Sequence, residues 1–158
     1  MILLSACLAG VPCRMDGKSK PVPALTALAL RGEAILVCPE VLGGLPTPRS
    51  PSERQPDGRV RSAQGADVTE AFRRGAERAL EICRSRGCCC AVLKARSPSC
   101  GKDCIYDGSF SGRLVPGNGV FAALLQESGI PVLTEEEALT ELPQLAAEAV
   151  REQSGGRP

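Results

Sequence analysis

The sequence predicts an α/β fold in which a mostly parallel sheet carries helices on both faces. Four short apolar runs alternate with helical segments along the chain, which is the order expected when each strand is followed by a crossover helix. The chain has 158 residues, a length that suits one domain with one hydrophobic core. No internal repeat or linker divides it, and we expect residues 1–153 to form a single domain and residues 154–158 a frayed tail.

The first half of the chain holds two of the apolar runs, at residues 1–6 and 34–37. Between them, residues 22–31 are expected to form a short helix, because Gly32 follows as a typical C-terminal capping residue. The segment 43–65 is rich in Gly, Pro, Ser and Arg and shows no periodicity. We expect a long loop there, of the kind that is either functional or disordered.

The clearest helix is expected to begin at Asp67, an N-cap residue with Glu70 three positions later, and to end near Gly87. Apolar residues recur along it at helical spacing. The remaining elements are a strand at 88–93, a loop at 101–119, a helix at 120–128 closed by Gly129, a strand at 130–133 and a polar helix at 135–151 with a break near Pro143.

Histidine is missing from the chain, and its absence excludes several kinds of site. There is no imidazole for a Ser-His-Asp or Cys-His pair, and no histidine to bind a metal. Any metal must therefore be bound by thiolates or carboxylates. Proton transfer near neutral pH must use Glu, Asp, Lys or Cys.

Nine cysteines are present, an odd number that cannot be fully paired in disulfides. No stretch approaches transmembrane length, and the first apolar run is too short for a signal peptide and lacks a basic segment. We therefore expect a cytoplasmic protein without membrane contact, in which clustered thiols serve metal binding or catalysis. A net charge of +1 and 3% aromatic residues predict no stable nucleic-acid binding.

Three of the predicted strands lead into loops that carry cysteines. Cys7 follows the first strand, with Cys13 six residues later; Cys38 follows the second, beside Glu40; and the third leads to Cys100. In open parallel sheets, ligands bind beyond the carboxyl ends of the strands, so these thiols are expected to converge on one crevice. A four-thiolate zinc site and an iron–sulfur cluster both suit such thiols, and the spacing does not separate them.

The other cysteines have simpler interpretations. Cys83 falls on the apolar face of its helix, and Cys88, Cys89 and Cys90 alternate faces of a strand, so we expect all four to be structural. Cys104 is expected to be structural or incidental. A redox protein that pairs it with Cys100 is one alternative.

Polar residues near the thiols are candidates for the chemistry. Glu40 is the best candidate acid or base because histidine is absent, although by itself it would be an exposed loop carboxylate. Ser97 and Ser99 could equally serve as turn or capping residues, and Lys94 as a solvated charge at a strand end.

Four motifs, in order, resemble those of the bacterial thiouracil desulfidase family. They occupy residues 5–14, 38–46 and 65–69, and the paired segments 93–101 and 105–108. The resemblance extends over residues 1 to about 133. One departure is Met15, which stands where the family usually has an aromatic residue.

The resemblance implies a Rossmann-like fold that holds a [4Fe–4S] cluster by only three cysteines. The fourth iron then stays open to the sulfur of a thiolated pyrimidine. Carried over by motif, the cluster ligands are Cys7, Cys13 and Cys100, with Cys38 as a further candidate.

The resemblance also implies a reaction, the non-redox hydrolytic removal of sulfur from a 2- or 4-thiouracil derivative such as 4-thiouridine monophosphate. From the same motifs we assign Glu40 and Ser97 as catalytic, and Lys94, Ser99 and Gly101 as substrate-binding. The substrate is expected to be a free nucleobase or nucleotide. Two alternative functions stay open: a zinc-stabilised binding module and an iron–sulfur protein that carries or donates sulfur.

Overall fold

A four-stranded parallel sheet forms the centre of the molecule. The computed structural model describes residues 1–142, so the expected tail at 154–158 and the break at Pro143 lie outside the described residues. The sheet has the order β2-β1-β5-β8, in which every neighbouring pair is parallel. Its strands are β1 (Ile2–Ser5), β2 (Ala34–Val37), β5 (Ala91–Leu93) and β8 (Val132–Thr134). The predicted α/β class is confirmed.

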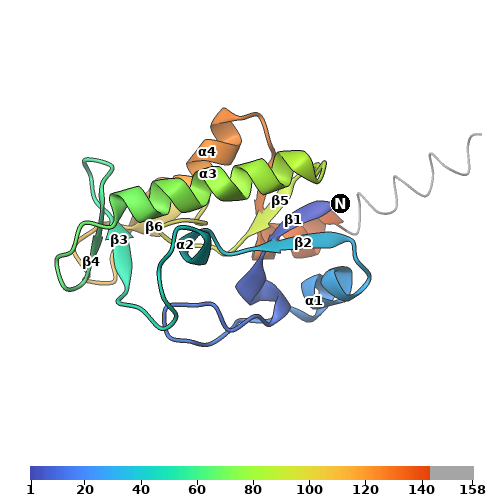
Figure 1. Ribbon diagram of the computed structural model, residues 1–158. Coiled ribbons are helices and arrows are strands. Elements are labelled where there is room, and N and C mark those ends of the chain that lie inside the picture. The colour runs from blue at the N-terminus through green and yellow to red at the C-terminus, as the bar shows by residue number, and fades with distance from the viewer. Residues whose placement is uncertain (143–158) are drawn as a thin grey trace, which may run out of the picture.

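Helices cover both faces of this sheet, as expected from the alternation of runs (Figure 1). Because side chains alternate along a strand, Leu3 and Leu4 of β1 enter two separate cores. Leu3 packs with the helices α3 (Thr69–Ser85) and α4 (Val120–Glu127), and Leu4 packs with α1 (Pro23–Leu30) and helical residues 135–142. No helix among residues 1–142 is long and apolar enough to cross a membrane.

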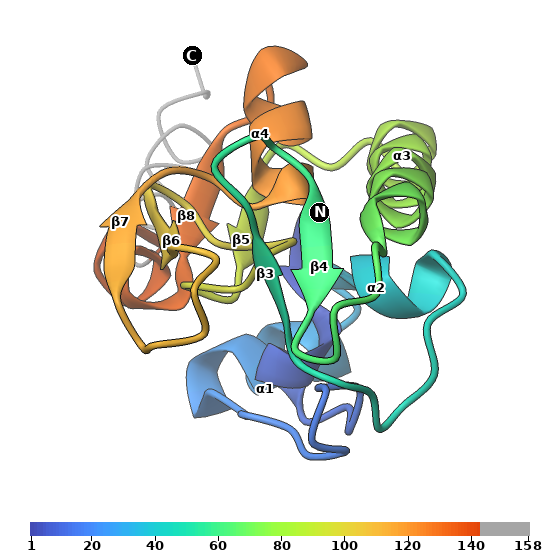
Figure 2. The ribbon, with the colours of Figure 1, turned by 90° about the vertical axis from the view of Figure 1, so that its left-hand side faces the viewer.

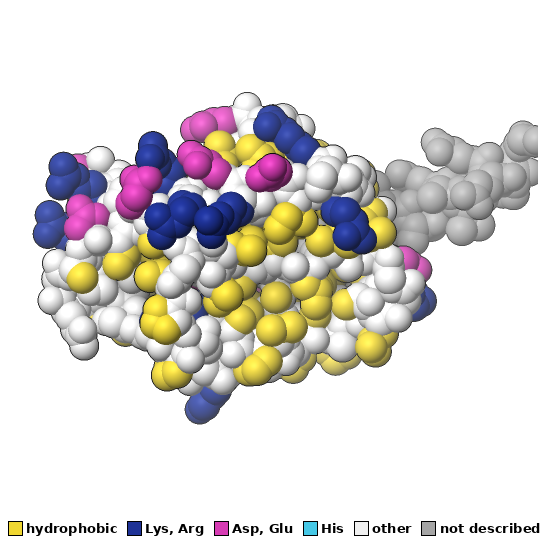
Figure 3. All heavy atoms as spheres, viewed as in Figure 1, with side chains coloured by type: hydrophobic (Ala, Val, Ile, Leu, Met, Phe, Trp, Pro, Cys, Tyr) yellow, Lys and Arg dark blue, Asp and Glu magenta, His cyan; other side chains and the backbone are white. Residues whose placement is uncertain are grey.

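The longest helix, α3, is strongly amphipathic. Its buried side includes Phe72, Ala76 and, as predicted, Cys83, while charged side chains cover its outer face (Figure 3). The helix begins two residues later than expected, at Thr69. Its N-cap residue is Val68 rather than Asp67, whose carboxylate accepts the Thr69 N–H at 3.0 Å in the turn before the helix.

The start of β5 also differs from the expectation. Cys88, Cys89 and Cys90 precede the strand, which begins at Ala91. The Cys88 N–H donates to the Cys83 carbonyl at 3.0 Å, so the chain is still completing the turn after α3 at this point. Cys90 is buried, Cys88 half-buried and Cys89 exposed.

Two short hairpins occupy the segments that were expected to be loops. They are formed by β3 (Ser52–Arg54) with β4 (Val60–Ser62), and by β6 (Cys104–Tyr106) with β7 (Leu114–Pro116). Each strand has only three residues, too few for apolar periodicity to mark it.

The two hairpins are joined to each other by hydrogen bonds. Glu53 accepts the N–H groups of Gly108 at 3.0 Å and Phe110 at 3.1 Å, and Gln55 donates to the Gly108 carbonyl at 3.1 Å. Figure 2 shows both hairpins at one end of the molecule, in front of the parallel strands. The hairpins lie beyond the carboxyl ends of the parallel strands, and their residues line one side of the cavity at these ends.

A short helix that the sequence did not predict, α2 (Pro39–Leu42), follows β2 and lies against α3. The contact has no room for side chains: a Cβ on Gly75 would be 1.8 Å from the Pro39 carbonyl oxygen, and one on Gly43 would be 2.0 Å from that of Ala71. Two glycines therefore fix the position of α2.

Replacing Gly75 with alanine is expected to destabilise the protein by about 1–3 kcal/mol, the usual cost of overpacking, because α2 must move away from α3. The measurement is denaturant unfolding of the purified protein. Glu77→Ala, at an exposed position of the same helix, is the control and should unfold like the parent. An unchanged or raised midpoint for Gly75→Ala would contradict the described contact.

Candidate active site

A cavity of about 500 Å³ opens at the carboxyl ends of β1, β2 and β5, and residues of β3 and β6 line its outer side. The sheet order explains its position. The chain passes from β1 to β2 on one side and later returns to β5 on the other, so β1 lies at the point where the strand order reverses. Ligands of open α/β sheets bind at such a point, and this volume suits a small molecule.

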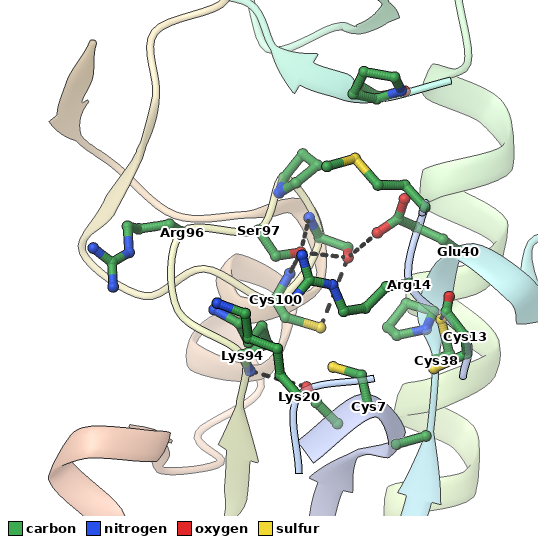
Figure 4. A pocket seen from close by; sticks show the side chains of 18 of the residues that line it. Cys7, Cys13, Arg14, Lys20, Cys38, Glu40, Lys94, Arg96, Ser97 and Cys100 are labelled. Carbon is green, nitrogen blue, oxygen red and sulfur yellow. Dashed lines mark hydrogen bonds between the residues drawn. The ribbon is translucent and has the colours of Figure 1, made fainter. Parts of the chain in front are cut away.

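Four cysteines line this cavity, and they are the four that the sequence predicts to converge. Cys7 lies in the short helix η1 (Ala6–Ala9), Cys13 in the loop after it, Cys38 just before α2 and Cys100 in the loop after β5. Figure 4 shows the Cys7 and Cys100 sulfurs facing each other, with Cys13 and Cys38 to one side. Cys38 is half-buried and the other three are buried.

The surroundings of Cys38 and Cys100 favour the neutral thiol. Burial raises the pKa of Cys100 to about 12. A hydrogen bond with Cys13, followed by burial, raises the pKa of Cys38. Thiols of this kind become thiolates when a cationic group binds, because its charge compensates theirs. The donor set therefore fits a soft, thiolate-bound metal group.

Within residues 1–142, no three Cys, Asp or Glu side chains are arranged to hold a single metal ion. A structural zinc ion requires its sulfur ligands about 2.3 Å from one point. The four thiols share a cavity without meeting at such a point. The four thiols provide the soft donors that iron–sulfur clusters require.

Glu40 lies in the first turn of α2 and extends toward the loop after β5 (Figure 4). Its Oε2 accepts a hydrogen bond from Ser99 Oγ at 3.1 Å, and its Oε1 accepts one from Arg49 Nε at 3.1 Å. Its side chain is 15% exposed, so the carboxylate is largely shielded from solvent but not completely buried. One oxygen is thus held by a cation and the other faces a hydroxyl group.

The serine hydroxyls continue this network. Ser97 Oγ lies 3.0 Å from Ser99 Oγ and accepts the backbone N–H groups of Ser99 at 3.2 Å and Cys100 at 3.0 Å. Two N–H donors stabilise negative charge on the Ser97 oxygen. Glu40, Ser99 and Ser97 therefore form a hydrogen-bonded chain beside the thiol of Cys100.

The remaining predicted site residues divide into two groups. Lys94 lines the cavity, where its Nζ lies 3.2 Å from Glu135 Oε1. Gly101 and Cys104 do not line it. A Cβ on Gly101 would be 2.6 Å from the Ser97 carbonyl oxygen, so the glycine allows the serine loop to close. Its assignment to substrate binding stays a prediction.

Comparison with known proteins identifies the family. A family model described as 2-thiouracil desulfurase matches residues 2–137. The chain belongs to the 2-thiouracil desulfurase family. The resemblance seen in the four sequence motifs is confirmed.

Two relatives show how far the family likeness extends. A solved structure of a [4Fe–4S]-dependent thiouracil desulfidase, TudS, is 48% identical and superimposes with a TM-score of 0.86, covering 92% of this chain and 97% of that chain. YbbK, an uncharacterized protein of Bacillus subtilis (strain 168), is 38% identical over 146 residues, which are 87% of this chain and 97% of the relative.

This 2-thiouracil desulfurase family member also carries site residues that sequence reasoning missed. Arg49 contacts Glu40, and three further cationic side chains line the cavity: Arg14, Lys20 and Arg96. Arg49 lies in the long Pro- and Ser-rich segment, where no periodicity indicates which side chains point inward. The only signal was the Arg content of a segment long enough to be functional.

Proposed function

We propose that the protein is a [4Fe–4S]-dependent desulfidase that hydrolyses the carbon–sulfur bond of a thiolated pyrimidine and releases sulfide. The observation that carries this proposal is the meeting of four thiols and the Glu40 carboxylate in one cavity of small-molecule size. The description of TudS as a [4Fe–4S]-dependent thiouracil desulfidase supports it.

In this proposal Cys7, Cys13 and Cys100 hold the cluster. Their burial at the ends of two strands supports the assignment. Cys38 is the fourth candidate, and its greater exposure and contact with the Cys13 carbonyl, at 3.8 Å, suit a residue at the edge of the site. When bound, the cluster supplies a Lewis-acidic iron for the leaving sulfur.

Glu40 acts as the general base on the water molecule. Its Oε2 takes a proton from water, whose oxygen then bonds to the thiocarbonyl carbon. The electron pair of the thiocarbonyl double bond moves to sulfur, which takes the first proton back from Glu40. The remaining carbon–sulfur bond then breaks, and its electron pair leaves with sulfur as hydrosulfide. Glu40 removes the second water proton from the added hydroxyl group, so that the carbonyl forms, and passes this proton to hydrosulfide. One water is consumed and one hydrogen sulfide is released, with no change in oxidation state.

The serines and Lys94 orient these groups. Ser99 holds Glu40 Oε2 at 3.1 Å, so the carboxylate presents that oxygen to the cavity. Ser97 is 3.0 Å from Ser99 and offers a path by which the proton moves between Glu40 and the leaving group. Lys94, held by Glu135, donates to an oxygen of the substrate.

The charge of the cavity supports a phosphorylated substrate, such as 4-thiouridine monophosphate. Five cationic side chains line the cavity against the two carboxylates Glu40 and Glu53. Lys20 has no acidic partner among residues 1–142, so its ammonium group is available to a phosphate. Cationic side chains in a partly enclosed cavity bind phosphate through charge-assisted hydrogen bonds.

The function is tested by anaerobic reconstitution, counting of iron and sulfide, and assay of 2-thiouracil, 4-thiouracil and 4-thiouridine monophosphate. A brown protein that releases free sulfide and forms the corresponding oxo-pyrimidine is expected. A colourless zinc protein, or sulfur that appears only on an added acceptor, would instead support the binding module or the sulfur carrier.

Replacing Lys20 with alanine is expected to raise KM for 4-thiouridine monophosphate about tenfold or more, the effect of losing a hydrogen bond to a charged group. The KM for the free base should change little. Lys18→Ala is the matched control, since Lys18 is exposed and does not line the cavity. Equal changes for base and nucleotide would exclude phosphate binding by Lys20.

A further inference from the structure

We infer that Arg49 is a positioning residue of the desulfidation reaction and acts through Glu40. The inference rests on the proposed function, in which Glu40 is the general base. Arg49 belongs to none of the sequence motifs and reaches the site from the long loop after α2. Its side chain is 7% exposed, so it is enclosed with the carboxylate it contacts.

The guanidinium group is held on all sides. Its Nε donates to Glu40 Oε1 at 3.1 Å and its Nη2 to the Cys13 carbonyl at 2.9 Å. Its Nη1 donates to the Pro46 carbonyl at 3.2 Å and to Thr47 Oγ1 at 3.1 Å. Every nitrogen of the group therefore has a partner, and the rigid guanidinium plane links α2 to the loop that carries Cys13.

This arrangement determines how the carboxylate is presented. Arg49 occupies Oε1 and Ser99 contacts Oε2, so rotation about the last bond of the Glu40 side chain would break both interactions. Oε2 is thereby directed to the cavity. Because Arg49 also holds the Cys13 peptide, it fixes the spacing between the base and the thiols.

Other arginines near α2 have a different role. Arg74 donates to the Gly43 carbonyl at 3.2 and 2.6 Å, and Arg78 to the Leu42 carbonyl at 2.6 Å. Both arginines are exposed residues of α3 that bond to carbonyls at the end of α2, and neither forms a hydrogen bond with Glu40. They provide matched controls that weaken the anchoring of α2 without releasing the carboxylate.

The test compares reconstituted Arg49→Ala, Arg49→Lys and Arg74→Ala enzymes. Arg49→Ala is expected to lower kcat about 100-fold, the cost of a misplaced catalytic group, with KM and iron content close to wild type. Added guanidinium should restore part of kcat. Arg49→Lys should have a kcat between those of the wild type and Arg49→Ala, because an ammonium group can bond to one partner of Arg49 but not to all. Arg74→Ala should keep the wild-type kcat.

A double-mutant cycle identifies the residue through which Arg49 acts. In a Glu40→Gln background, Arg49→Ala should have almost no further effect on kcat, because the two changes remove one function. Independent losses, an unchanged kcat for Arg49→Ala, or loss of iron from both Arg49 variants would each overturn the inference. Full activity of Glu40→Gln alone would instead refute the proposed base.

Discussion

Replacing Glu40 with glutamine is expected to lower kcat by about 10²–10⁴-fold, the usual contribution of a general base. Glutamine has the same size and its amide oxygen can still accept a hydrogen bond, but it cannot take a proton from water. Release of sulfide from the reconstituted variant measures the loss. Iron per chain should equal that of the wild type, because Glu40 contacts Arg49 and Ser99 and no cysteine sulfur.

The control for this variant is Glu77→Gln, a change of the same chemistry at an exposed position of α3. It should retain wild-type kcat. Wild-type turnover in Glu40→Gln would remove the residue from the mechanism. Loss of iron together with activity would assign Glu40 to the cluster site instead.

Replacing any one of Cys7, Cys13 or Cys100 with serine is expected to abolish activity by removing most of the bound iron. Iron–sulfur clusters are held by soft thiolates, and serine provides only a hard hydroxyl oxygen. Iron and sulfide counts with the visible absorption spectrum measure the loss. Cys89→Ser is the matched control, because Cys89 is exposed and does not line the cavity.

Cys38→Ser tests the assignment of the three ligands. The proposed set predicts that this variant keeps its iron, since Cys38 lies at the edge of the site. Should Cys38→Ser lose the cluster while one of the other three variants keeps it, Cys38 would replace that residue as a ligand. Denaturant unfolding of each iron-free variant shows whether the protein has lost only a cluster ligand or has also lost its fold.

The main sheet could be predicted because its central strands, β1 and β5, are buried on both faces. Residues such as Leu3, Leu4 and Val92 are fully buried, so the strands appear in the sequence as continuous apolar runs. The convergence of the thiols followed from the same argument, since parallel strands end at one edge of the sheet. The position of Cys38 and Cys100 required no information beyond the strand order.

Features that depend on tertiary contacts could not be predicted from the pattern of apolar residues in the sequence. The hairpins are short and partly polar, and contacts such as that of Glu53 with Gly108 hold them together. Arg49 reaches Glu40 through loop geometry alone. The packing of Gly101 against the Ser97 carbonyl also appears only in the folded loop.

The meeting of strand ends at the cavity has a consequence for how the enzyme matures. Cys7 and Cys100 are separated by more than half of the chain, and β5 must pair with β1 before their sulfurs can share a site. No fragment that ends before β5 contains both cysteines, so with the proposed ligands the complete cluster site exists only after β5 has paired with β1. Brown colour in a reconstituted variant that keeps these cysteines would then report that β1 and β5 have paired.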